Sequence, residues 1–360
     1  MENVEWVSFY VTGIKDLPCS LCNLSRLKGL SIGGDEMCKI PSVIAMMPQL
    51  SMCNIWLGGN KRRVSEKQED GLHGILTPSL PSSKVKSLKL AGCNLSDEFF
   101  PLALAWFPNV EILELWDNNF TFLPECIKEF RFLWWLNVDN CQHLQEIRGV
   151  PPNLEYFSAV ACKLLNPMGT SVLVKQKVHE DRWTRFVMPG RRIPRWFEQR
   201  RSGSSISFWF RGTIFPYDAL SFAVLILDDI FPCRIEVTPV VTINGNRVCP
   251  GLKKTAVDQL FIFSIRTRYH YSSLHFEKGW NHVEVSCEAK IASLAKEIGM
   301  HGLKPKDTSI IQDIRFTDPY NMTEIVIMMM MLSIVFPNHK KQPLPPETCI
   351  GLWTLLFLTI

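Results

Sequence analysis

The chain of 360 residues has no apolar run long enough to cross a lipid bilayer. The apolar stretch Ile325–Phe336 has 12 residues, whereas a spanning helix needs roughly 20. Residues 1–20 also lack the basic start and apolar core that mark a secretory signal. We therefore do not expect a membrane protein. The alternative is a membrane-associated protein anchored by the apolar runs at 325–336 and 350–360.

A phosphate-binding loop is also missing. No Gly-x4-Gly-Lys-Ser/Thr string occurs, and the nearest one, Gly245 to Gly251 followed by Leu252, has the wrong spacing. The net charge of +4 is small, and no basic stripe with interleaved aromatic residues is present, so nucleic acid is not an expected partner. We expect a non-catalytic protein without a cofactor.

Metal-binding patterns are absent as well. Cys19-Ser-Leu-Cys22 is a bare cysteine pair with only Cys38 nearby, and a zinc site needs a second pair of ligands. Half of the 12 cysteines occupy structural positions of the repeat pattern: Cys22, Cys53, Cys93, Cys126, Cys141 and Cys162. We expect reduced thiols in the cytoplasm, with the nucleus as a second compartment. Four Asn-x-Ser/Thr sequons leave an extracellular location as the alternative: Asn23, Asn94, Asn119 and Asn321.

What the first half does contain is one pattern that recurs along the chain. Its clearest copy runs from Val85 through Leu88, Leu90 and Cys93 to Leu95, with variable residues between the apolar ones. The copies are anchored at Leu27, Leu50, Val85, Val110, Leu133 and Leu154. This is the signature of leucine-rich repeats, in which one strand per repeat builds a continuous sheet. Cys or Asn recurs at one offset after each strand, where a small polar side chain caps backbone groups of the turn.

The spacing of these anchors supports the interpretation. The intervals are 21 to 25 residues, with one exception of 35 residues between Leu50 and Val85, and leucine-rich repeats have periods of about 20–29. The long interval contains the charged run 61–71, which cannot bury itself. We interpret it as a loop extruded from one repeat.

The variable residues of each strand are predicted to face solvent on a concave binding surface. Aromatic anchors with polar neighbours are typical of protein-binding hot spots. The alternative is that an adjacent domain covers them. The predicted binding residues are Met52, Asn54, Trp56, Ser87, Lys89, Ile112, Glu114, Trp116, Trp135, Asn137, Asp139, Tyr156 and Ser158.

The leucine periodicity ends near Asn166-Pro-Met-Gly, and short β-like runs follow. They are 204–211, 220–227, 234–243, 259–266 and 281–287. Asn244-Gly245 is a hairpin signal between two of them. Strands without intervening helices predict a β-sandwich or jelly roll. We therefore expect repeats at 1–165, a linker at 166–185, a β-domain at 186–320 and an irregular apolar tail at 321–360.

The opening of the second half resembles a known family. Pro189-Gly190-Arg-Arg-Ile193-Pro-Arg-Trp196-Phe197, followed by Gly203-Ser-Ser-Ile-Ser207, is similar to the start of the post-repeat domain in plant TIR-type nucleotide-binding leucine-rich-repeat immune receptors. Trp280–Cys287 resembles the closing strand of that domain, and Asp313–Asp318 resembles a recurrent tail. The resemblance implies an α/β leucine-rich-repeat solenoid followed by an all-β jelly-roll/Ig-like sandwich. Trp196 and Phe197 are both expected to be buried.

The resemblance also implies a function and partners. The repeats would recognise a pathogen effector in plant defence or restrain the receptor's own nucleotide-binding and TIR domains. Neither of those domains is encoded in this sequence. A second reading is a truncated or decoy fragment that binds a full-length receptor.

Overall fold

The structure is a computed structural model that describes part of the chain in detail. The described residues are 3–10, 17–34, 43–57, 84–166, 173, 184–217, 219–226, 236–249, 254–255, 259–266, 276–289, 295–303 and 313–320. The chain divides into two compact units, Met1–Ile314 and Arg315–Ile360. The charged loop 61–71, most of the predicted linker and the apolar tail lie outside the described residues. None of the helices in the described part has the length and apolar composition that crossing a bilayer requires.

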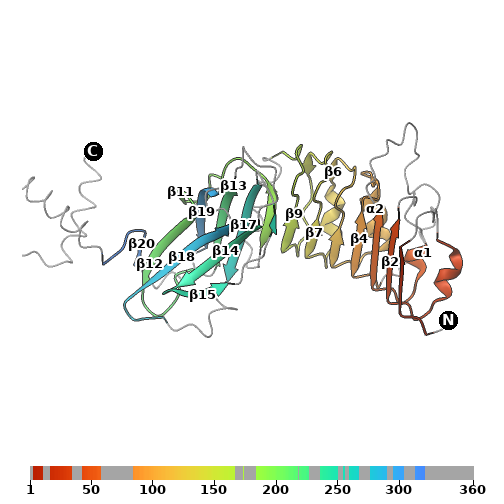
Figure 1. Cartoon of the computed structure of the whole chain (residues 1–360), viewed down its shortest axis with the longest axis horizontal. Helices are drawn as coiled ribbons and strands as arrows, with labels where there is room; N and C mark the ends of the chain where they lie inside the picture. The colour runs from red at the N-terminus through yellow and green to blue at the C-terminus, as the bar shows by residue number, and fades with distance from the viewer. Residues whose placement is uncertain are drawn as a thin grey trace, which may run out of the picture. The chain divides into compact units, whose positions relative to one another are not determined.

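Parallel strands stand side by side in chain order through the first half (Figure 1). They are β1 (Trp6–Tyr10), β2 (Gly29–Gly34), β3 (Met52–Leu57), β4 (Ser87–Ala91), β5 (Ile112–Glu114), β7 (Trp135–Asn137) and β9 (Tyr156–Ser158). Each predicted repeat supplies one of them, which confirms the pattern. β1 is a strand that the sequence analysis missed.

The returning half of each repeat is short and mostly irregular. It contains η1 (Cys19–Asn23), α1 (Val43–Met46), α2 (Phe99–Trp106), β6 (Phe122–Leu123), η2 (Glu125–Glu129) and β8 (Glu146–Ile147). β6 and β8 pair in parallel as a separate small sheet. In the described repeats the strands therefore alternate with short helical and extended segments. The longest described helix, α2, has eight residues.

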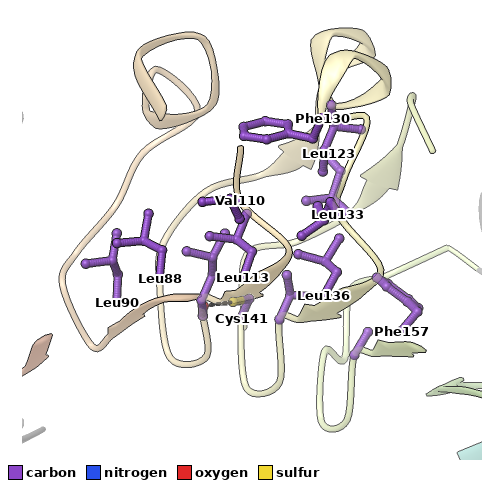
Figure 2. Close-up of a cluster of buried hydrophobic side chains, with 14 of the residues drawn as sticks. Leu88, Leu90, Val110, Leu113, Leu123, Phe130, Leu133, Leu136, Cys141 and Phe157 are labelled. Atoms are coloured by element: carbon purple, nitrogen blue, oxygen red, sulfur yellow. Dashed lines mark hydrogen bonds between the residues drawn. The ribbon is translucent and has the colours of Figure 1, made fainter. Parts of the chain in front are cut away.

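The core lies between the strands and these returning segments. Leu88, Leu113, Leu136 and Phe157 are in register across four neighbouring strands and are at most 1% exposed. Figure 2 shows Leu123 and Phe130 reaching toward the strand leucines from the returning side. Full burial of such a side chain stabilises the folded state by about 1.5–3 kcal/mol relative to leaving it exposed. The face of the sheet that carries the regularly spaced apolar residues is therefore the one that is covered.

A ladder of small polar side chains closes the turns after β4, β5, β7 and β9, as the recurring Cys or Asn predicted. Asn118 is 1% exposed; its Nδ2 donates to the carbonyls of Leu90 (2.8 Å) and Leu115 (2.9 Å). At the same offset Cys141 Sγ donates to the carbonyl of Leu115 over 3.3 Å, and Cys162 Sγ donates to that of Val138 over 3.0 Å. The hydrogen bond with Cys141, and after it burial, raises the pKa of the Cys162 thiol above its usual range. Cys162 therefore remains a thiol that acts as a hydrogen-bond donor.

The sheet of the repeats continues into the second half. β10 (Arg185–Pro189) pairs in parallel with β9 and antiparallel with β17 (Gln259–Arg266). The order then runs β17, β13 (Ala219–Ile226), β19 (Ala295–Leu303) and β11 (Gln199–Ser202). The predicted linker at 166–185 lies mostly outside the described residues, and β10, which begins at its end, continues the sheet of the repeats.

A second, antiparallel sheet belongs to the same region. Its order is β15 (Asn246–Cys249), β14 (Glu236–Ile243), β18 (Trp280–Ala289), β12 (Ser205–Arg211) and β20 (Ile314–Arg315), and β16 (Lys254–Thr255) pairs with β14. The five predicted β-like runs correspond to β12, β13, β14, β17 and β18. Asn244 and Gly245 both have positive φ, 49° and 78°, which is the hairpin turn that the sequence predicted.

Aromatic side chains join the two sheets. The ring of Tyr217 lies against Gly302 of β19, where an added Cβ would be 2.1 Å from the ring. The same ring makes an edge contact with Phe208 of β12, with centroids 5.9 Å apart. Glycine at 302 is therefore needed so that an aromatic ring can fill the space between the sheets.

The junction motif seats the second half on the common core. Phe197 is fully buried (0% exposed), as predicted. Trp196 is only partly buried and packs against the core with its ring 4.2 Å from that of Phe197. The prediction that both rings are buried is therefore confirmed for Phe197. Trp196 is partly exposed, because it lies on the outer side of the pair.

Candidate protein-binding face of the repeats

The strand register brings the predicted binding residues into rows on the face of the sheet opposite the core. We call this surface the strand face. One row is Met52, Ser87, Ile112, Trp135 and Tyr156, and the next is Asn54, Lys89, Glu114, Asn137 and Ser158. Trp56, Trp116 and Asp139 lie beyond them at or just after the strand ends. The spacing of the sequence repeats therefore placed the predicted residues of the strands themselves on one side of the sheet.

The middle of the strand face carries opposite charges. Lys89 Nζ lies 3.0 Å from Glu114 Oε1, and the two side chains are 39% and 18% exposed. Such a partly exposed pair contributes about 1 kcal/mol or less to stability. Its main effect is to fix two charges, one of each sign, between aromatic neighbours.

Exposure along the strand face is uneven. Trp56 is 46% exposed, whereas Trp116 and Trp135 are half-buried. Trp135 stacks on Tyr156 with ring centroids 3.5 Å apart and planes within 8°. Trp135 is therefore held by its neighbour before any partner binds, which lowers the entropy that binding would cost at this ring.

Three predicted binding residues are buried, so the expectation of solvent exposure was wrong for them. Ser87 is 7% exposed, Tyr156 5% and Ser158 0%. Tyr156 lies between Trp135 and Arg185 of β10 in the strand register. Burial, and to a smaller degree the charge of Asp139, raises the pKa of its phenol. At the last repeat, neighbours within the sheet therefore cover part of this face.

Asp139 organises the polar side of that covered end. Its carboxylate accepts hydrogen bonds from the Val160 N–H (2.7 Å) and from the Ser158 hydroxyl. Its own N–H donates to Asn137 Oδ1 over 2.9 Å. Asp139 therefore stabilises the loop after β7. Its role in the candidate site is to hold this loop in place.

The strand face extends past the predicted residues at the other end. Trp6 and Tyr10 of β1 are 61% and 77% exposed. Their rings lie over Gly29 and Gly33 of β2, where an added Cβ would be 2.1 Å and 2.9 Å from the nearest ring atoms. The spacing of Val4, Val7 and Phe9 was the signal that could have revealed this repeat.

The described residues offer no group of three or more His, Cys, Asp or Glu side chains that could hold a metal ion. Cys19 and Cys22 lie in η1, where the Cys22 thiol donates to the Cys19 carbonyl over 2.6 Å. The two cysteines therefore belong to a turn of the first described repeat, which this hydrogen bond helps to close.

Comparison with known proteins agrees with this architecture. The family described as "Disease resistance protein RPS4B-like, leucine-rich repeats" matches residues 2–182. TMV resistance protein N of Nicotiana glutinosa is 25% identical over 178 residues, which are 45% of this chain and 16% of that protein. Disease resistance-like protein DSC1 of Arabidopsis thaliana is 29% identical over 108 residues, 29% of this chain and 9% of that protein.

The chain spans less than a fifth of the length of these relatives. A solved leucine-rich-repeat protein of Leptospira interrogans is 16% identical, with a TM-score of 0.25 over 45% of this chain and 50% of that one. The family match extends over half of the chain and over all the parallel strands of the repeats. The chain therefore belongs to the leucine-rich-repeat family of RPS4B-like plant disease resistance proteins.

Proposed function

We propose that this chain is the recognition part of a plant intracellular immune receptor and that it binds a protein partner on its strand face. The observation that carries the proposal is the set of aromatic rings, Trp56, Trp116 and Trp135, arranged around the Lys89–Glu114 ion pair. Protein-binding hot spots are enriched in aromatic anchors such as these. Membership in a disease resistance family supports the same role.

The partner we propose is a pathogen effector or the nucleotide-binding and TIR domains of a receptor. In the first case the repeats detect infection, and in the second they restrain the receptor at rest. A truncated or decoy fragment that binds a full-length receptor is a variant of the second case. Binding by surface complementarity suits either partner, because no covalent step is needed.

The remaining parts of the proposal follow from the same reasoning. We propose that the two antiparallel sheets form the jelly-roll/Ig-like domain of such receptors, that the chain is not an enzyme, and that it works in the cytoplasm or nucleus. Free thiols at Cys53, Cys93, Cys141 and Cys162 support a reducing compartment.

Trp116→Ala is expected to weaken binding by about 2 kcal/mol, roughly 30-fold in Kd, because truncation removes a hot-spot ring. The same result is expected for Trp56→Ala. The measurement is biolayer interferometry of the wild-type chain against a panel of pathogen effectors and the nucleotide-binding domain of a TIR-type resistance protein. Each hit is then titrated with the variants.

Trp209→Ala is the matched control, since Trp209 is a half-buried ring on β12 beside His282, with centroids 4.4 Å apart. It should leave Kd unchanged. If Trp56→Ala and Trp116→Ala bind every hit as tightly as wild type does, the strand face is not the recognition surface.

The purified chain is expected neither to hydrolyse NAD nor to bind ATP, because it has no phosphate-binding loop. Isothermal titration calorimetry with ATP and a fluorescent assay of NAD cleavage check this. Binding of ATP at micromolar concentration would contradict the non-catalytic assignment.

A further inference from the structure

Exposed aromatic side chains line an open recess that is separate from the strand face. It lies where the chain enters β7 and β9, and its walls are Glu111, Phe132, Trp134, Asn153 and Glu155. Phe132 is 55% exposed and Trp134 is 37% exposed. The recess has a volume of about 470 Å³. Its exposed rings lie beside carboxylates, and this arrangement needs a physical explanation.

A row of side chains crosses the strand entrances at this level. Backbone hydrogen bonds connect Glu5 to Lys28, Lys28 to Ser51, Ser51 to Lys86, Lys86 to Glu111, Glu111 to Trp134 and Trp134 to Glu155. Oppositely charged neighbours in the row form ion pairs. Lys28 Nζ lies 2.9 Å from Glu5 Oε1, and Lys86 Nζ lies 2.7 Å from Glu111 Oε1.

The pairing stops at Trp134. Glu155 follows it in the row, and the Arg185 N–H donates to the Glu155 carbonyl, but no described residue forms an ion pair with the Glu155 carboxylate. Neighbouring strands lie about 4.8 Å apart, so Glu111 and Glu155 flank the indole of Trp134 on either side. A positive charge placed over Trp134 would face one carboxylate on each side.

The chemistry of the recess selects the kind of cation. A guanidinium is planar, stacks on an indole ring and can donate to two carboxylates at once. A lysine ammonium is a compact point charge that lacks the stacking surface. Phe132 adds apolar surface for the methylene part of a long side chain.

We propose that this recess binds an arginine side chain from a basic segment of a partner protein. The guanidinium lies on the Trp134 indole between Glu111 and Glu155 and completes the row of paired charges. This contact is independent of the strand face and adds a second anchor whose specificity is for positive charge.

The test uses the full chain labelled with 15N-tryptophan and observes its 11 indole N–H groups by NMR. Trp134→Phe identifies the Trp134 resonance. The probe is the peptide acetyl-Gly-Arg-Arg-Gly-amide, and its matched control replaces each arginine with citrulline, which has nearly the same shape and no charge. The arginine peptide is expected to shift the Trp134 resonance saturably at millimolar concentration, and the citrulline peptide is expected to leave it in place.

Glu155→Gln is expected to weaken binding of the arginine peptide about threefold, since it removes one partly exposed charge partner. Glu146→Gln is the control variant: Glu146 is a carboxylate in β8 that is more exposed than Glu155 and is paired with Arg148 at 2.7 Å, and it should change nothing. An equal shift with citrulline, an unchanged Kd in Glu155→Gln, or no saturable shift would each overturn the proposal. Shifts confined to Trp56 and Trp116 would place the peptide on the strand face and would overturn it as well.

Discussion

Phe197→Ala is expected to lower the free energy of unfolding by about 3–5 kcal/mol, the range for removing a buried aromatic ring. Phe197 has no exposed surface and belongs to the core that runs from the repeats into β10, β17 and β13. It lies with Ile193 on Gly299 of β19; an added Cβ there would be 2.9 Å from Ile193 and 3.3 Å from Phe197. The cavity would therefore open where these strands meet the junction motif.

Urea denaturation followed by tryptophan fluorescence and by far-ultraviolet circular dichroism measures this effect. Phe132→Ala is the matched control, because Phe132 is 55% exposed, and a change below about 0.5 kcal/mol is expected there. Trp196→Ala should fall between the two, since that ring is only half-buried. Equal midpoints for Phe197→Ala and wild type would show that the junction motif does not seat the second half on the core.

The same junction shows where sequence reasoning succeeds and where it stops. The apolar period of the repeats fixed the strand positions, because each inward residue must face the returning segment to be covered. The run Asn244-Gly245 fixed a hairpin, because consecutive positive φ angles favour those residues. Both inferences depend on local chemistry alone.

Contacts between distant segments were beyond such reasoning. Tyr156 occupies a variable position of its repeat, yet it is 5% exposed, because Trp135 stacks on it and β10 continues the sheet beside it. β19 escaped prediction because Gly299, Gly302 and two charged residues, Lys296 and Glu297, interrupt its apolar pattern. In the structure Ile193 and Phe197 pack against Gly299 and Tyr217 packs against Gly302, so the missing side chains are replaced by residues far away in sequence.

The candidate site shows the same division. The rows of the strand face follow from the repeat period, so the positions of Lys89 and Glu114 were predictable and their ion pair follows from neighbouring strands. The recess at Trp134 was not predictable. The argument for an arginine site there depends on ion pairs at the strand entrances, between residues 23 to 25 positions apart. It also depends on Glu155, which forms no such pair with a described residue.

Asn118→Ala is expected to destabilise the chain by about 2–5 kcal/mol, because several buried backbone groups would lose their partner together. Asn118 Oδ1 accepts from the Leu95 N–H over 3.0 Å, and its Nδ2 donates to the carbonyls of Leu90 and Leu115. Asn118→Cys should lose less. A thiol can still donate to one carbonyl, as Cys141 does, but it accepts the Leu95 N–H only weakly.

The same denaturation experiment ranks these variants, with Asn119→Ala as the matched control. Asn119 is the exposed neighbour, and its side chain hydrogen-bonds only to Asn94 among the described residues, so a change within about 0.5 kcal/mol is expected. The expected order of stability is wild type and Asn119→Ala, then Asn118→Cys, then Asn118→Ala. If Asn118→Cys proved as damaging as Asn118→Ala, the thiols of Cys141 and Cys162 would have to act by packing. In that case only Asn118, among these small polar side chains, would stabilise the turn through its hydrogen bonds.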